Sequence, residues 1–246
     1  MTVLGASRIL AILDDDKSVQ DALQDLIQAE GMSALCFSSA EEFLHSRARH
    51  EVGCLIADIQ MPGMSGVDLQ MHLKAERCPM PIIFLTGRGD IPLAVSAMKQ
   101  GASDFHTKPV DSTLLLMSVE RALRRNLANL QAANELASLV TRYESLTPRE
   151  REVLPLLADG LLNKQVAFEL GITECTVQLH RGHIMRKMEA DSFATLVRLA
   201  DKIRRGMRAD RLLDLDGQRH MTGKERAVPW NGIESRAVRS NARQIH

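Results

Sequence analysis

The chain has few aromatic residues, few cysteines and no long apolar run, and each shortage excludes a class of protein. Of its 246 residues, 3% are aromatic and four are cysteines, with no CxxC pair among them. That number and spacing argue against a disulfide scaffold and against a zinc site. No apolar run approaches the roughly 18 residues that a membrane span needs, and no secretory signal is recognisable. We therefore expect a soluble cytoplasmic protein without a membrane partner.

The chain also lacks an excess of either charge, because 31 basic side chains balance 31 acidic ones. The balance is uneven along the sequence. Residues 1–126 carry four more acidic than basic side chains, whereas residues 206–246 carry three more basic than acidic ones. An acidic front and a mildly basic rear indicate different partners for the two halves.

The first 125 residues alternate short apolar runs with amphipathic stretches. The runs ILAIL, CLIADI, PIIFLTG and ASDFHTK predict buried strands, MSALCFSS predicts a weaker one, and the stretches between them have helical spacing. Five strands alternating with five helices predict a doubly wound α/β domain with a five-stranded parallel sheet over residues 7–125. Ligands of such folds bind at the carboxyl ends of the strands.

Residues 126–205 predict helices only. Residues 126–144, rich in Leu, Ala, Asn and Gln, predict a helical linker that is either a stiff spacer or a helix packed on its own domains. Residues 145–205 predict a separate all-α domain of four helices, one of which Asn163 would cap. Residues 206–246 are polar and Arg-rich, and their apolar residues show no helical or strand periodicity. We expect them to be disordered.

Charged and polar residues lie at the ends of the predicted strands of the first domain. Asp14 and Asp15 end the first strand, Asp58 ends the third, Thr86 ends the fourth and Lys108 ends the fifth. Parallel strand ends converge on one edge, so several carboxylates, a hydroxyl and an ammonium should meet there. Mg²⁺ prefers carboxylate oxygens, and a remaining carboxylate is a nucleophile for phosphoryl transfer. The set therefore predicts a magnesium-dependent phosphoryl site.

These residues resemble the receiver domain of two-component response regulators, over about residues 7–125. The acid pair, DIQMPGMSG, LTG and KP occur in the family's order and spacing. The resemblance implies that Asp58 accepts a phosphoryl group from a sensor histidine kinase, in a self-catalysed step of a protein that is otherwise no enzyme. It further implies that Mg²⁺ is held by Asp14, Asp15, Asp58 and the backbone carbonyl of Gln60. Asp16 lies outside this set and is expected to be solvated.

The same resemblance names a switch and a dimer surface. Thr86 and Phe105 resemble the family's switch pair, in which the hydroxyl moves toward the phosphoryl group and the ring turns inward. Val95 and Lys99, on the affected helix, are then candidates for a contact in a homodimer formed on phosphorylation. The alternative for Phe105 is a plain core aromatic.

The stretch NKQVAFELGITECTVQLH has helix-turn-helix proportions, and residues 146–205 resemble the DNA-binding domain of the LuxR/NarL/FixJ group. The whole chain most resembles the FixJ subgroup. We expect double-stranded promoter DNA and RNA polymerase as partners, and transcription activation as the outcome. Base reading is expected from Gln178, Leu179, Gly182, His183 and Arg186, and phosphate contacts from Lys164, Thr173, Thr176, Arg181 and Lys187. The group often has Lys in place of Gln178, so the preferred operator should differ. The alternative for each residue is a solvated helix face.

Two other functions fit parts of the sequence. DDDKS is close to the DxDx(T/V) signature of haloacid-dehalogenase phosphatases, which would make Asp14 a catalytic nucleophile. That interpretation fails on Ser18, on the absent late acidic pair and on the attached helix-turn-helix. The second is a DNA-binding regulator whose receiver no longer switches, which the complete pocket disfavours.

Overall fold

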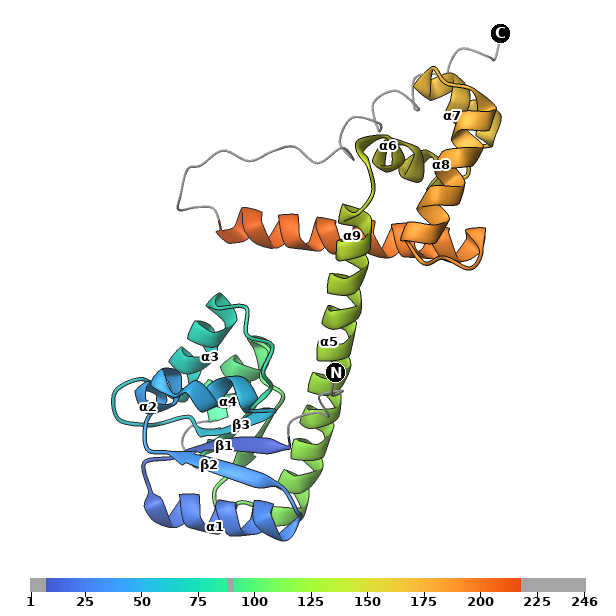
Figure 1. Ribbon diagram of the computed structural model, residues 1–246. Helices are drawn as coiled ribbons and strands as arrows, with labels where there is room; N and C mark the ends of the chain where they lie inside the picture. The colour runs from blue at the N-terminus through green and yellow to red at the C-terminus, as the bar shows by residue number, and fades with distance from the viewer. Residues whose placement is uncertain (1–7, 88–90, 218–246) are drawn as a thin grey trace. The chain divides into compact units, whose positions relative to one another are not determined.

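The computed structural model describes residues 8–87 and 91–217. The chain divides into two compact units, residues 1–132 and residues 133–246, which Figure 1 shows as a sheet with helices and a group of helices. The division falls inside one long helix, α5 (Ser112–Glu144), so the expected linker is helical. Among the described residues, no helix has both the length and the apolar character to cross a membrane.

The first unit is a five-stranded parallel sheet in the order β2-β1-β3-β4-β5, which confirms the predicted fold. Helices cover both of its faces (Figure 1). The strands are β1 (Ile9–Leu13), β2 (Ser33–Phe37), β3 (Cys54–Asp58), β4 (Ile82–Thr86) and β5 (Asp104–Thr107). The helices are α1 (Lys17–Ala29), α2 (Ala40–His45), α3 (Gly66–Ala75), α4 (Ile91–Lys99) and the start of α5, with a short 3₁₀ helix at Arg47–Glu51.

The central strands are apolar on both faces because each face is covered by helices. Leu10 and Ile12 of β1 belong to a core shared with α1 and α5, whereas Ala11 and Leu13 belong to a core shared with α2, α3 and α4. Each fully buried Leu or Ile contributes about 1.5–3 kcal/mol to folding. The two cores hold the strand ends in register, and the polar residues that follow those strands are thereby fixed in space.

The described part of the second unit, residues 133–217, contains helices only, as predicted. They are the end of α5 followed by α6 (Pro148–Ala158), α7 (Asn163–Leu170), α8 (Glu174–Lys187) and α9 (Phe193–Gly217). Thr147 and Glu150 form a capping box at the start of α6. Asn163 is not the cap of α7: it is the first helical residue, and the preceding Leu162 N–H donates to Gln165 Oε1 at 2.8 Å. A glutamine in the first turn replaces the expected cap.

The expectation of disorder from residue 206 is wrong for residues 206–217, because α9 continues to Gly217. Gly206 does not end the helix. A Cβ at this position would lie 2.9 Å from Leu136 Cδ2 of α5, so the glycine permits close packing between two helices. Met207 beyond it packs against the core of the second unit. The remaining part of that expectation, residues 218–246, lies outside the described residues.

Gly66 provides a test of how tightly α3 packs behind β3. A Cβ there would lie 2.4 Å from the Asp58 carbonyl oxygen and 2.9 Å from Phe84 Cε1. Because the nearest atom is backbone, Gly66→Ala should destabilise the first unit by about 1–3 kcal/mol, the usual cost of overpacking. Urea unfolding followed by circular dichroism measures this. Gly182→Ala is the control: it has open space around it and should be neutral or stabilising by up to about 1 kcal/mol. Equal stability of Gly66→Ala and wild type would contradict the prediction.

Candidate functional site

Three carboxylates gather at the carboxyl ends of β1 and β3. Asp14, Asp15 and Asp58 each place an oxygen within 4.8 Å of the others. Leu13 of β1 pairs with Ala57 of β3 in the parallel register, so the next residues, Asp14 and Asp58, lie at the same level of the two neighbouring strands. Asp14 and Asp58 are buried and Asp15 is exposed. A cluster of carboxylates that is open on one side has the donor set of a hard divalent cation.

Lys108 links the two buried carboxylates. Its Nζ lies 2.6 Å from Asp14 Oδ2 and 2.6 Å from Asp58 Oδ2. Its backbone N–H donates to the Thr86 carbonyl at 2.8 Å, which fixes the lysine at the end of β5. Thr86 itself is buried, and its hydroxyl donates to the Gly87 carbonyl at 3.1 Å. The structure therefore brings together the carboxylates, the lysine ammonium and the hydroxyl that the sequence predicts at the strand ends.

Burial and hydrogen bonding act in opposite directions on these charges. Burial raises the pKa of the Asp14 carboxyl above its usual range, although the hydrogen bond from Lys108 opposes this. Burial alone would lower the pKa of Lys108, but its bonds to Asp14 and Asp58 outweigh that effect and raise it. Lys108 is thus held as an ammonium, while the ionised form of Asp14 remains costly.

Two residues that support the site were not identified from the sequence. Asp16, expected to be solvated, is exposed but caps α1, since its Oδ1 accepts from the Ser18 N–H at 2.8 Å and hydroxyl at 2.6 Å. An Asp directly before a helix was the available signal. Gln20 is buried and its Nε2 donates to the carbonyls of Asp14 (2.6 Å) and Phe37 (3.1 Å). No local pattern marks Gln20, because its partners come from two different strand ends.

The remaining residues predicted for the first unit lie where the topology puts them. Gln60 follows β3, and its N–H donates to Asp58 Oδ1 at 3.0 Å. Phe105 of β5 is half-buried against the core formed with α2, α3 and α4. Val95 and Lys99 are exposed on α4. Their proposed roles in switching and dimerisation are compatible with these positions.

The proposed DNA-reading helix is α8, which buries one face and exposes the other. Val177, Ile184 and Met188 are buried. The opposite face exposes Gln178, Leu179, Gly182 and Arg186. Thr173 is the N-cap and accepts from the Thr176 N–H at 3.2 Å, and Lys164 is exposed on α7.

Three residues of the predicted DNA set have partners inside the second unit. Lys187 Nζ donates to Glu150 Oε2 at 2.7 Å and to the Ser145 carbonyl at 3.2 Å. His183 Nδ1 lies 3.6 Å from Glu150 Oε1, and the Arg181 guanidinium lies over the Phe193 ring at 4.2 Å. Side chains with such partners hold helices together. Glu150, which also belongs to the capping box of α6, is the buried anion that contacts two of them, His183 and Lys187.

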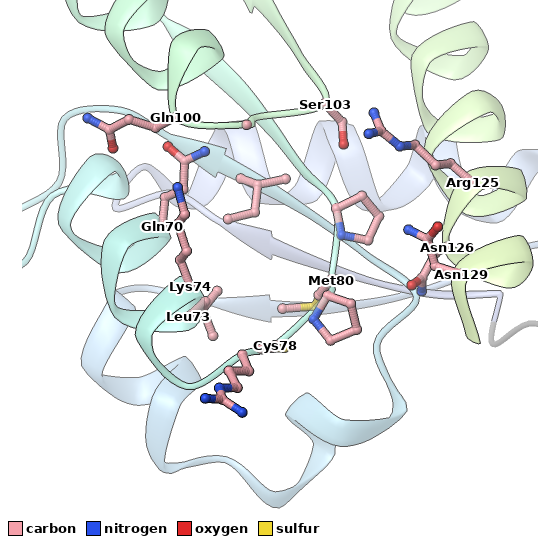
Figure 2. Close-up of a pocket in the computed structure, with 15 residues that line it drawn as sticks. Gln70, Leu73, Lys74, Cys78, Met80, Gln100, Ser103, Arg125, Asn126 and Asn129 are labelled. Carbon is pink, nitrogen blue, oxygen red and sulfur yellow. The ribbon is translucent and has the colours of Figure 1, made fainter. Parts of the chain in front are cut away.

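A polar cavity lies away from the acid cluster, at the amino-terminal ends of the strands, beside Ile82 at the start of β4 (Figure 2). Its volume is about 300 Å³, and Gln70 and Asn126 lie on opposite sides of it (Figure 2). Gln70 Nε2 donates to the Ala97 carbonyl at 3.2 Å, and Asn126 Nδ2 donates to the Gly53 carbonyl at 2.9 Å. These bonds tie α3 to α4 and α5 to the start of β3, so both amides serve the fold.

Comparison with known families identifies a domain in each of the two units. Residues 10–120 match the response regulator receiver domain, and residues 144–200 match the luxR family of bacterial regulatory proteins. The chain belongs to the response regulators with a LuxR-type DNA-binding domain. Its architecture is that of transcriptional response regulators.

Several relatives are similar over most of their length. The response regulator protein TodT of Pseudomonas putida is 46% identical over 196 residues, covering 80% of this chain and 86% of TodT. The transcriptional regulatory protein FixJ of Bradyrhizobium diazoefficiens is 39% identical over 199 residues, covering 81% and 96%. The solved structure of the response regulator StyR is 43% identical with a TM-score of 0.70, covering 79% and 98%.

The raised pKa of Asp14 leads to a prediction about stability. Above that pKa the native state carries a buried carboxylate, so Asp14→Asn should stabilise the first unit at neutral pH. The advantage should be present above the raised native pKa and disappear as pH falls toward the ordinary value of about 4, where wild type is also neutral. Urea unfolding of both proteins between pH 4 and pH 8 measures the difference in their free energies of unfolding. We expect this gap to be about 1 kcal/mol at neutral pH. A gap that widens as pH falls would contradict this assignment.

Proposed function

We propose that this response regulator is switched by phosphorylation of Asp58 and then controls transcription. The cluster of Asp14, Asp15 and Asp58, with oxygens within 4.8 Å of one another and the Lys108 ammonium 2.6 Å from two of them, carries the proposal. It combines a cation site, an ammonium suited to a phosphoryl oxygen and a carboxylate nucleophile. Such a set is expected where charge on a phosphoryl group must be neutralised.

Asp58 is the proposed phosphoacceptor. A carboxylate oxygen forms a bond to phosphorus while the P–N bond of a phosphohistidine on a sensor histidine kinase breaks, and the electron pair of that bond returns to the imidazole. Lys108 would bind one phosphoryl oxygen, and the Thr86 hydroxyl would turn toward another. The transfer modifies the protein once, so the chain acts as a regulator and not as an enzyme with turnover.

The donor set fits Mg²⁺, which in such a site neutralises charge on the phosphoryl oxygens. Asp14, Asp15, Asp58 and the backbone carbonyl of Gln60 would hold it. Asp14 and Asp58 are buried beside one lysine, so two carboxylates face one ammonium and Asp15 adds a third. The residual negative charge supports the choice of a cation as ligand.

Phosphorylation would act on DNA binding through a homodimer. In this proposal Thr86 and Phe105 form the switch, and the exposed Val95 and Lys99 of α4 contribute to the dimer contact.

The proposed domains are the receiver at residues 7–125, the linker at 126–144 and the DNA-binding domain at 145–205. They would act on promoter DNA in the cytoplasm. Two copies of α8 would then meet adjacent half-sites. RNA polymerase is the proposed further partner, and the family resemblance favours activation.

Peptide mapping after incubation with acetyl phosphate and Mg²⁺ tests the phosphoacceptor. Wild type should carry the phosphoryl group on Asp58, and Asp58→Asn should carry none, because an amide is not a nucleophile for this step. The phosphorylated protein should form dimers and bind its operator more tightly. Label on Asp14 would support the phosphatase interpretation instead. Label on Asp58 without any change in dimerisation or affinity would identify a receiver that does not switch.

The surface of α8 leads to a prediction about sequence reading. Gln178→Ala should cost about 1–3 kcal/mol on the preferred operator and little on random DNA, because only a base-reading contact depends on sequence. Lys164→Ala should weaken binding to all sequences alike and reduce the slope of log affinity against log salt by about 1. Binding isotherms at several salt concentrations measure both.

Lys187→Ala is the matched control for Lys164→Ala, since it removes the same charge from a lysine that is paired internally. Burial alone would raise the pKa of Glu150, but hydrogen bonds from Lys187 and Thr147 outweigh this and lower it. Lys187→Ala should therefore destabilise the second unit and leave the salt slope of the folded protein unchanged. An equal loss of slope in both variants would return Lys187 to the DNA contacts.

A further inference from the structure

Glu41 lies outside the acid cluster, yet its carboxylate contacts the loop that follows Asp58. It is half-buried in the first turn of α2, and its Oε1 accepts a hydrogen bond from the Met64 N–H at 3.0 Å. Met64 belongs to residues 59–65, the loop between β3 and α3. The same loop carries the backbone carbonyl of Gln60. The carboxylate thus connects α2 to the segment that would present a cation ligand.

Gly63 shows how closely the loop and the carboxylate fit. Its φ is +79°, and a Cβ there would lie 2.9 Å from Glu41 Oε1. The Met61 side chain between Gln60 and Gly63 is buried in the core. The loop is therefore anchored on both sides of Met61, by the Gln60 N–H to Asp58 Oδ1 at 3.0 Å and by the Met64 N–H to Glu41.

Backbone hydrogen bonds favour the ionised form of this carboxylate. Hydrogen bonds from the backbone N–H groups of Glu41 itself and of Met64 hold the pKa of Glu41 below its usual range. Charge-assisted bonds of this kind are shorter and stronger than bonds between neutral groups. The adjacent Glu42 has a different task, since its Oε2 accepts from the Ser38 N–H at 2.8 Å and hydroxyl at 3.0 Å.

We propose that Glu41 is a positioning residue for the cation site, holding the loop at residues 59–65 so that the Gln60 carbonyl is directed at the ion. Glu41 touches neither the ion nor the phosphoryl group. Outer partners of metal ligands fix ligand orientation and thereby affinity. The inference rests on the proposed function, because Gln60 is a ligand only within it.

Phosphorylation of the full-length chain by acetyl phosphate over a series of Mg²⁺ concentrations tests this role. Two quantities are measured: the Mg²⁺ concentration at half-maximal rate and the rate at saturating Mg²⁺. Glu41→Ala should raise the half-saturating concentration about tenfold, the lower end of the loss seen for outer partners of metal ligands. The saturated rate should stay within about twofold, since the change affects cation binding and not the transfer step.

Two variants separate positioning from charge. Glu41→Gln keeps an oxygen acceptor in the same place without the charge, and should restore most of the Mg²⁺ affinity that Glu41→Ala loses. Glu42→Ala removes the same charge from the next residue of α2 and should behave as wild type. Equal shifts in all three variants would show a general loss of negative charge and would overturn the inference.

A double-mutant cycle with Gly63→Ala tests the contact itself. The strain of a Cβ at positive φ is present in both backgrounds and cancels in the cycle. The remaining clash should make Gly63→Ala cost less Mg²⁺ affinity in Glu41→Ala than in wild type, and urea midpoints confirm that each variant is folded. If wild type took no label on Asp58, the proposed function would fail. If it took label and Glu41→Ala kept the half-saturation of wild type, only the role of Glu41 would fail.

Discussion

The ion pairs between Lys108 and the carboxylates of Asp14 and Asp58 are the interaction on which the polar edge of the receiver depends. The three charges follow three different strands, and β4 separates β3 from β5 in the sheet. Lys108 must therefore reach across the end of β4, where its own N–H is bonded to the Thr86 carbonyl. Without the ammonium, two buried carboxylates would face each other across neighbouring strands, and one would have to stay protonated. With this strand order, a lysine side chain at the end of β5 is long enough to reach both carboxylates. Thr86, at the end of β4, then lies next to the charges.

Each unit contains buried charge, but the two units balance it differently. In the second unit one buried anion, Glu150, has Lys187 as its cation, so the charges match and the pair joins α6 to α8. In the receiver the three acids exceed the single lysine. A protein that needed these groups only for stability would gain from replacing them with apolar residues of similar volume. The excess is understandable where a cation and a phosphoryl group are to be bound, because strain and uncompensated charge accumulate at functional sites.

How far the sequence predicts this molecule depends on whether a feature is local. The strands, their parallel order and the acids that follow them could be predicted, because apolar runs and the residues after them lie next to each other in the chain. The roles of Gln20 and Glu41 could not, because each contacts a segment that is distant in sequence. The same reason applies to three residues of the second unit. The sequence predicts DNA contacts for Arg181, His183 and Lys187, but it does not reveal that Phe193 and Glu150 lie within their reach.

The alternation of β5 connects the proposed switch to the linker helix. Phe105 packs toward α2, α3 and α4, whereas Asp104 and His106 point to the other face and are joined to α5: Ser118 Oγ donates to Asp104 Oδ2 at 2.5 Å and lies 3.0 Å from His106 Nε2. Further along, α5 contributes Leu139 and Tyr143 to the core of the second unit. β5 is thus joined to α5, the helix that carries residues of both units. Such a connection transmits a signal only if phosphorylation favours one of two arrangements by more than thermal energy. The hydrogen bonds of Ser118 with Asp104 and His106 would carry a displacement of β5 to α5.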